Sequence, residues 1–236
     1  MPGHKLRQFA GIWAMPEALT CVNIRPMLRI LLTIGIFAVL PVFAAAQTRV
    51  IDGDTLELGG TVYRLNGIDA PEFGQTCGRW RCGAEATEAL KKVVSGKSLR
   101  CEPLSRDGYG RVIATCFANG QDIGAKMVAD GFAWAFVRYS DAYTDQEVTA
   151  KAKSLGIWSG NYEPAWDFRA SRWQQAQQAA PKGCPIKGNI TKNGRIYHPP
   201  WSPWYAKTRI DTSKGERWFC TEAEALAAGW RAPRWT

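Results

Sequence analysis

Two cysteines lie symmetrically about a turn signal near the middle of the chain. The midpoint of Cys101 and Cys116 falls inside the run Asp-Gly-Tyr-Gly at 107–110. A turn centred there pairs the strand-like segments 98–104 and 111–117 as antiparallel neighbours and places the two thiols directly opposite each other. Opposed positions approach closely enough for a disulfide. The spacing therefore predicts a hairpin whose two strands are joined by a covalent bond.

Further β-like and helical segments surround this hairpin. Strands are predicted over 48–58 and 61–68, joined at Gly59-Gly60, and over 132–139. Apolar residues at helical spacing predict helices over 84–94, 122–130 and 145–155. Five strands and three helices make this part of the chain mainly β within an α+β class.

The first 46 residues have the composition of a targeting signal. Residues 27–46 combine a basic start, an apolar run of 13 residues and the small-residue end Ala44-Ala45-Ala46. Such a run is too short for a comfortable membrane span. We interpret 1–46 as a signal peptide region with its true start at Met27, and expect a secreted or periplasmic protein. An uncleaved signal anchor is the alternative.

Cysteine number and charge fit an exported protein that meets polyanions. Six of the seven cysteines follow the expected cleavage point, and an even count in an exported chain favours three disulfides. The net charge is +9, and removal of 1–46 takes away four cationic residues and one acidic residue, leaving +6. A basic surface suits nucleic acid or anionic envelope components, although basic residues also serve plain solubility.

The chain divides after the predicted helices. A glutamine-rich stretch within 161–183 is typical of a linker, and 184–236 forms a small tryptophan-rich unit with a predicted helix over 221–228. A unit this small has a thin core, so a Cys184–Cys220 bridge is expected to stabilise it. A zinc site that adds His198 to these two cysteines is the less favoured alternative. The tryptophans form either its core or an exposed face for nucleic acid or envelope glycans.

Carboxylates and an arginine gather within about twenty residues near the start of the first strands. Asp52 and Asp54 are two apart, so we expect both on one face of an extended strand. Asp69 and Glu72 follow on the next segment. Hard oxygen donors of this kind suit Ca²⁺. Arg64 is five residues before Asp69, so a bend near Gly67 is needed to bring the two together.

Taken together, these motifs resemble the staphylococcal nuclease (thermonuclease) family over about residues 48–160. The matching pieces are Val-Ile-Asp-Gly-Asp-Thr at 50–55, Arg-Leu at 64–65 with Ile-Asp-Ala-Pro-Glu at 68–72, Asp-Gly-Tyr-Gly-Arg at 107–111 and Gly-Ile-Trp-Ser at 156–159. The resemblance implies an OB-fold, a five-stranded barrel with three helices. Together with the composition, it predicts four parts: a signal region (1–46), a nuclease-like domain (47–160), a linker (161–183) and an accessory domain (184–236). The accessory domain resembles the small sunset module.

The resemblance also implies Ca²⁺-dependent hydrolysis of DNA and RNA. It assigns the metal to Asp54, Asp69 and the Ala70 carbonyl, with Asp52 in support of these ligands. Glu72 matches the residue that activates or orients the attacking water. Arg64 and Arg111 match the arginines at the scissile phosphate, and Tyr109 and Tyr139 match tyrosines near the bound nucleotide.

Two other functions stay open at this point. Family members that have become non-catalytic nucleic-acid-binding modules commonly lose the acidic or arginine positions, which are all present here. An envelope-binding role would place the contact in 184–236.

Overall fold

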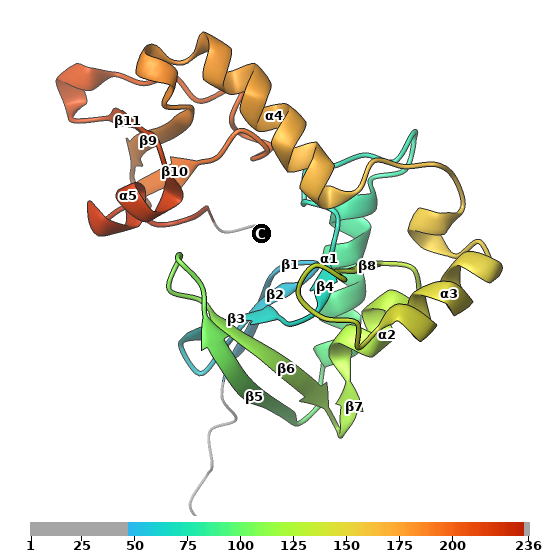
Figure 1. Ribbon diagram of the computed structural model, residues 1–236. Helices are drawn as coiled ribbons and strands as arrows, with labels where there is room; N and C mark the ends of the chain where they lie inside the picture. The colour runs from blue at the N-terminus through green and yellow to red at the C-terminus, as the bar shows by residue number, and fades with distance from the viewer. Residues whose placement is uncertain (1–46, 234–236) are drawn as a thin grey trace, which may run out of the picture. The chain divides into compact units, whose positions relative to one another are not determined.

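The computed structural model describes residues 47–233 (Figure 1). The expected signal region, with its start at Met27, lies outside the described residues. In the part of the chain that is described, no helix is both long and apolar enough to cross a membrane.

The main sheet contains five strands on one path and confirms the expected OB-type fold. In spatial order they are β1 Thr48–Asp52, β2 Thr55–Leu58, β3 Thr61–Leu65, β6 Val112–Ala118 and β5 Leu99–Arg106. Neighbours are antiparallel except β3 and β6, which are parallel. A short strand, β7 Gln121–Asp122, pairs with β6, and β4 Ile68–Asp69 pairs with β8 Trp134–Ala135.

The three predicted helices are present: the first two pack against this sheet, and the third packs against the second. They are α1 Cys82–Val94, α2 Ile123–Ala129 and α3 Thr144–Ala152. The core between sheet and helices contains Leu56, Leu90, Ala114, Ile123 and Met127, each no more than 1% exposed. Burial of this apolar surface supplies the main stabilising free energy of the domain.

The central hairpin has the predicted register. Cys101 lies opposite Cys116 on β5 and β6, and the two form a disulfide. Disulfides also join Cys77 to Cys82 and Cys184 to Cys220. The six described cysteines therefore make three bridges, and Cys184 and Cys220 are not available as zinc ligands.

Three predicted strands were wrong in extent. The run 61–68 is not one strand, because the chain turns at residues 66–67 between β3 and β4. The run 48–58 is not one strand but the β1–β2 hairpin, which turns at Gly53 and Asp54. A side chain at Gly53 would approach the Cβ atoms of Ala70 and Ala86 to 2.7 and 2.9 Å, so only glycine permits this close turn.

The run 132–139 was also predicted too long, because only Trp134 and Ala135 are in a strand. The chain then turns, with the Tyr139 N–H donating to the Phe136 carbonyl at 3.0 Å.

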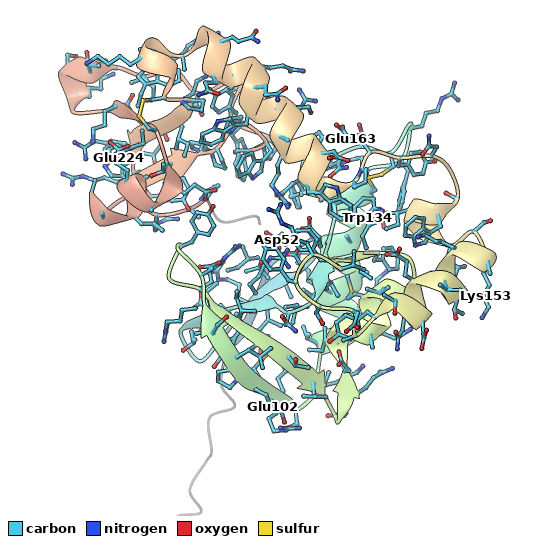
Figure 2. All side chains as sticks on the ribbon, viewed as in Figure 1. Asp52, Glu102, Trp134, Lys153, Glu163 and Glu224 are labelled. Carbon is cyan, nitrogen blue, oxygen red and sulfur yellow. A yellow bond between two sulfur atoms is a disulfide. The ribbon has the colours of Figure 1, made fainter. Side chains whose placement is uncertain are left out.

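The expected linker contains a helix, α4 Ala165–Ala179. Alanine, glutamine and arginine have high helix propensity, which outweighs the linker-like composition. Ala165 and Trp166 at its start pack with Trp134 and Ile157, and Figure 2 shows Trp134 and Glu163 near this end of the helix. The helix is thereby anchored to the nuclease-like domain.

The C-terminal segment is built on a three-stranded sheet in the order β10–β9–β11. Its elements are β9 Ile186–Thr191, β10 Gly194–His198, β11 Arg217–Phe219 and α5 Glu222–Ala227. Short 3-10 turns occur at Gly156–Trp158, Pro181–Gly183 and Thr212–Lys214. Phe219 and Trp230 are buried in the core of the C-terminal segment, whereas Trp204 is 37% exposed. The tryptophans therefore occur both in the core and on the surface.

His198 is buried in this segment and bonded to protein groups. Its Nδ1 lies 3.2 Å from Ser202 Oγ and its Nε2 lies 3.1 Å from Asn189 Oδ1. Burial, and then the nearby charge of Lys187, lower the pKa of His198 to about 4 from an ordinary value of 6.5.

The Cys101–Cys116 bridge gives a prediction on stability. The bridge closes a loop of 15 residues. Replacing both cysteines by alanine should lower the free energy of unfolding by about 3 kcal/mol, because the unfolded chain gains conformational freedom. Urea unfolding of the oxidised wild type and the double variant measures this. The difference should largely disappear when both proteins are unfolded in reductant, and a difference that persists there would contradict the entropic origin.

His198 gives a prediction on pH. The unfolded chain takes up the imidazole proton at a higher pH than the folded chain. The contribution of His198 to stability is therefore constant above pH 6.5 and falls between pH 6.5 and about 4. Relative to His198→Asn, the wild type should lose about 1–2 kcal/mol between pH of about 7.5 and 5 in urea unfolding. Equal losses in the two proteins would contradict a neutral buried histidine.

Candidate functional site

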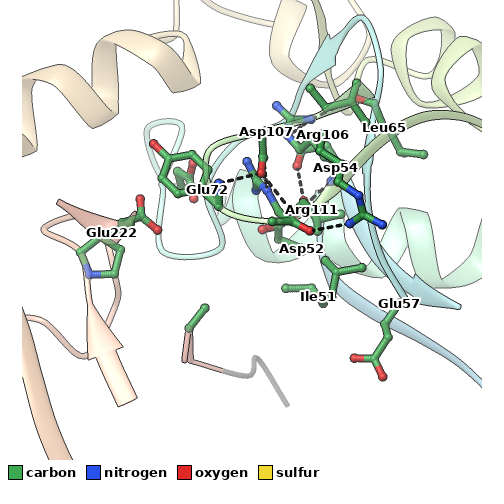
Figure 3. Close-up of a pocket in the computed structure, with 18 of the residues that line it drawn as sticks. Ile51, Asp52, Asp54, Glu57, Leu65, Glu72, Arg106, Asp107, Arg111 and Glu222 are labelled. Atoms are coloured by element: carbon green, nitrogen blue, oxygen red, sulfur yellow. Dashed lines mark hydrogen bonds and ion pairs between the residues drawn. The ribbon is translucent and has the colours of Figure 1, made fainter. Parts of the chain in front are cut away.

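A pocket of about 1120 Å³ lies where the carboxylate motif, the 107–111 turn and α4 meet. Figure 3 shows Asp52, Asp54 and Arg111 close together in it, and Glu222 of the C-terminal segment also lines it. The pocket brings together residues from distant parts of the sequence.

Arg64 on β3 joins two carboxylates at the base of the pocket. Its Nη1 lies 2.9 Å from Asp54 Oδ2, and its Nη2 lies 2.9 Å from Asp69 Oδ1. The chain reverses between Arg64 and Asp69 at Gly67, whose φ is +72°. The predicted bend is therefore present, and it places the arginine and Asp69 on the same side of the chain.

Asp54 is fixed by the turn that holds it. Its Oδ2 accepts from the Ala70 N–H at 2.9 Å and its Oδ1 accepts from Thr55 Oγ1 at 2.9 Å. Burial raises the pKa of Asp54, but the Arg64 charge and the Ala70 N–H outweigh it, so the pKa lies below the ordinary value. Asp54 therefore remains ionised while held against the Ala70 backbone.

Asp52 supports Asp54 from the other side of the same turn. Its Oδ1 accepts from the Asp54 N–H at 3.2 Å. The two carboxylates therefore flank Gly53 in a turn and do not share one face of a continuous strand, which corrects the sequence-based expectation. Burial, followed by the charges of Asp54 and Glu72, raises the pKa of Asp52 well above its ordinary value.

Asp69 on β4 is completely buried. Besides Arg64, it contacts Arg169 of α4, whose Nη1 lies 3.2 Å from Oδ1 and whose Nη2 lies 2.7 Å from Oδ2. Burial raises the pKa of Asp69 and outweighs the opposing charges of the two arginines. Both carboxylate oxygens of Asp69 thus accept hydrogen bonds from guanidinium groups.

Glu72 lies two residues beyond Ala70 and points toward the same helix. Its Oε1 accepts from Arg169 Nη1 at 2.7 Å, and its backbone N–H donates to Gln75 Oε1 at 3.2 Å. Burial raises the pKa of Glu72 to about 7, against the lowering effect of the Arg169 charge. A carboxylate with such a pKa can accept a proton near neutral pH.

Arg111 reaches the pocket from the turn after β5. Its Nε donates to Asp107 Oδ2 at 2.6 Å, and its guanidinium lies 5.2 Å from the centre of the Tyr109 ring. It forms no ion pair with Asp54 or Asp69. Asp107 therefore orients Arg111 along the wall of the pocket, and Arg64 lies at the floor of the same pocket.

The two predicted tyrosines lie at the pocket edge. Tyr109 is 44% exposed and Tyr139 is 71% exposed. The Tyr139 ring contacts Phe136 at 4.9 Å between centres, and Phe136 stacks on Trp166 of α4 at 5.4 Å. Exposed rings beside a charged pocket can stack on nucleobases.

The donor set suits a hard cation. Asp54 and Asp69 are held by one guanidinium, and the Ala70 backbone lies against Asp54. Like-charge repulsion among the carboxylates of the site contributes to the raised pKa values of Asp52 and Glu72, and a cation would relieve it. Within residues 47–233, no three or more His, Cys, Asp or Glu side chains are grouped to hold a metal ion. The predicted set contains only two carboxylates with a backbone carbonyl.

Sequence reasoning missed two residues of the site. Asp107 lies inside the turn motif at 107–111. Its position four residues before Arg111, across the turn, could have predicted that the two side chains pair. Arg169 lies in the segment expected to be a linker, 97 residues from Glu72 and 100 from Asp69. No local pattern around Arg169 indicates that it contacts the site.

The buried ion pairs give a prediction on stability. Arg64→Gln should lower the free energy of unfolding by about 3 kcal/mol, because Asp54 then lacks its charged partner in a buried position. Arg49→Gln is the matched control: Arg49 pairs with Glu57 on the same sheet, with side chains 34% and 28% exposed. That control should cost less than about 1 kcal/mol. Equal losses in urea unfolding would show that Arg64 does not compensate buried charge.

Two family models match different parts of the chain. Residues 62–160 match the family model described as "Staphylococcal nuclease homologue", and residues 169–232 match the model described as "ArfC". The latter gives the expected sunset-like module partial support.

Several curated proteins are similar to the chain over its nuclease-like part. The "Succinoglycan biosynthesis protein ExoI" of Rhizobium meliloti (strain 1021) is 39% identical over 136 residues, which cover 53% of this chain and 70% of that protein. An "Uncharacterized endonuclease" of Escherichia coli is 34% identical over 132 residues, covering 51% of this chain and 81% of that protein. The "Probable staphylococcal-like nuclease CAN3" of Oryza sativa subsp. japonica is 35% identical over 119 residues, which cover 49% of this chain and 30% of that protein. The chain therefore belongs to the staphylococcal nuclease family.

Proposed function

We propose that this protein is an exported, Ca²⁺-dependent nuclease that hydrolyses phosphodiester bonds in DNA and RNA. The observation that carries the proposal is the convergence of two arginines and two carboxylates on one pocket, namely Arg64, Arg111, Asp54 and Glu72. A third carboxylate, Asp69, is buried behind the pocket and pairs with Arg64. Relatives whose names include "nuclease" and "endonuclease" support the same reaction class.

The arginines supply the positive charge that the reaction needs. A phosphodiester is an anion and repels a hydroxide-like nucleophile, and further charge develops on its oxygens in the transition state. A guanidinium binds two phosphate oxygens at once, which orients the group as well as neutralising it. Arg64 is held rigidly by Asp54 and Asp69, and Arg111 by Asp107, so both are preorganised.

The carboxylates have separate roles in this proposal. Asp54, Asp69 and the Ala70 carbonyl would hold the metal, with Asp52 supporting Asp54 through its backbone N–H. When bound, Ca²⁺ supplies further charge neutralisation at the phosphoryl oxygens. Glu72 accepts a proton from the attacking water as the water oxygen bonds to phosphorus. The P–O5′ bond then breaks and the leaving O5′ takes a proton from solvent, while Glu72 later returns its proton to solvent, leaving a 3′-phosphate and a 5′-hydroxyl.

Export is supported by the cysteine chemistry. All six cysteines in the described residues form disulfides, which persist in oxidising compartments such as the periplasm and the exterior of the cell. Free Ca²⁺ and foreign nucleic acid are both available there. We propose DNA and RNA as the substrates and assign no envelope partner to the C-terminal segment.

The test is digestion of plasmid DNA and of single-stranded RNA by the chain from residue 47 onward, with Ca²⁺ or with a Ca²⁺ chelator. Glu72→Gln should lower the rate by about 10²–10⁴-fold, because the proton acceptor is lost. Arg111→Gln should lower it by about 10²-fold or more, because a preorganised charge is lost. Glu88→Gln, which removes an exposed carboxylate of α1 that pairs with Lys91, is the matched control and should leave the rate unchanged.

Binding of nucleic acid without cleavage in Ca²⁺ would identify the protein as a non-catalytic binding module. Cleavage that is equal with and without the chelator would reject the metal assignment while leaving the nuclease assignment in place.

A further inference from the structure

Arg169 is the only described residue outside the nuclease-matching segment that forms an ion pair with the proposed metal and base carboxylates. Its guanidinium contacts both oxygens of Asp69 and one oxygen of Glu72. It belongs to α4 and is the first residue of the segment that matches ArfC. A residue from the second half of the chain thus contacts the centre of the site.

The position of Arg169 is fixed by the helix that carries it. The Glu163 carbonyl, just before α4, accepts from Gln75 Nε2 at 2.7 Å. Ala165 is fully buried, and Trp166 stacks on Phe136. Arg169 lies four residues after Ala165, one helical turn further along the same face. The packed helix therefore aims this side chain at Asp69.

With Arg64 and Arg169 both in contact, Asp69 has no room for a third cation. Asp69 has no exposed surface, and Arg64 donates to the same carboxylate. Neither Asp69 nor Ala70 lines the pocket, whereas Arg64 and Arg169 do. A divalent cation at Asp69 would lie within a few ångströms of the Arg169 guanidinium, where like charges repel strongly in a partly buried site.

We propose that Arg169 is an internal cation of the site, which Ca²⁺ must displace from Asp69 in order to bind. The proposal rests on the proposed function, since it assumes that Asp69 is a Ca²⁺ ligand. Arg169 then sets the metal affinity of the enzyme, and α4 connects the C-terminal segment to that affinity. Release of Arg169 also frees Glu72, so one displacement exposes both the metal ligand and the proton acceptor.

Calorimetric titration of Ca²⁺ into the chain from residue 47 onward tests this without measuring activity. Arg169→Gln should bind Ca²⁺ about tenfold or more tightly than wild type, because the competing charge is removed. Arg169→Lys should fall between them, since lysine keeps the charge but lacks the planar fork that holds both oxygens. Arg172→Gln is the matched control: Arg172 is an exposed arginine of the same helix that contacts the Phe168 ring, and its loss should not change the affinity.

Equal or weaker Ca²⁺ binding by Arg169→Gln would overturn the proposal, because Arg169 would then not compete with the metal. If that variant does not fold, Arg169→Lys decides: tighter binding than wild type supports the proposal, and affinity at or below wild type overturns it. If Arg169→Gln binds Ca²⁺ and the wild type does not, that result also supports the proposal. If no protein binds Ca²⁺, both this inference and the metal assignment fail; if wild type and variant bind equally, only this inference fails.

Discussion

The site depends on one guanidinium, that of Arg64, which holds Asp54 and Asp69 at equal distances of 2.9 Å. Buried carboxylates repel each other and are costly to desolvate, so they can be gathered only around positive charge. The β1–β2 turn brings Asp54 to this arginine, and the bend at Gly67 brings Asp69. The strands, the turn at Gly53 and the packing of α1 behind it all serve to place these three side chains.

The rest of the site adds charge at the edges of that arrangement. Asp107 orients Arg111 on one wall, and Arg169 enters from α4. Three arginines therefore balance the acidic cluster, and two of them contact Asp69. A site that stabilises a phosphodiester transition state must be cationic overall, yet a site that binds Ca²⁺ must leave carboxylate oxygens available. Under the proposed function, exchange of Arg169 for the metal would satisfy both requirements with the same residues.

Much of the fold could be predicted from the sequence because its signals are local. The spacing of Cys101 and Cys116 about a turn predicts their register, and periodicity predicts α1, α2 and α3. Where the predictions were wrong, a neighbour distant in sequence decides the structure. Ala70 and Ala86 lie so close to residue 53 that only glycine fits the turn there. In the segment expected to be a linker, helix propensity favours α4, and packing of Trp166 on Trp134 fixes that helix in place.

The sequence by itself determined the chemistry of this protein: which carboxylates and arginines occur, in what order, and that they resemble a nuclease. Those residues occur in short motifs, and a motif preserves residue type and spacing even when its three-dimensional path is unknown. Only the tertiary structure decided that Arg169 contacts Asp69, from 100 residues away. Such a contact depends on how α4 packs against the barrel, and no local pattern in the sequence encodes that packing.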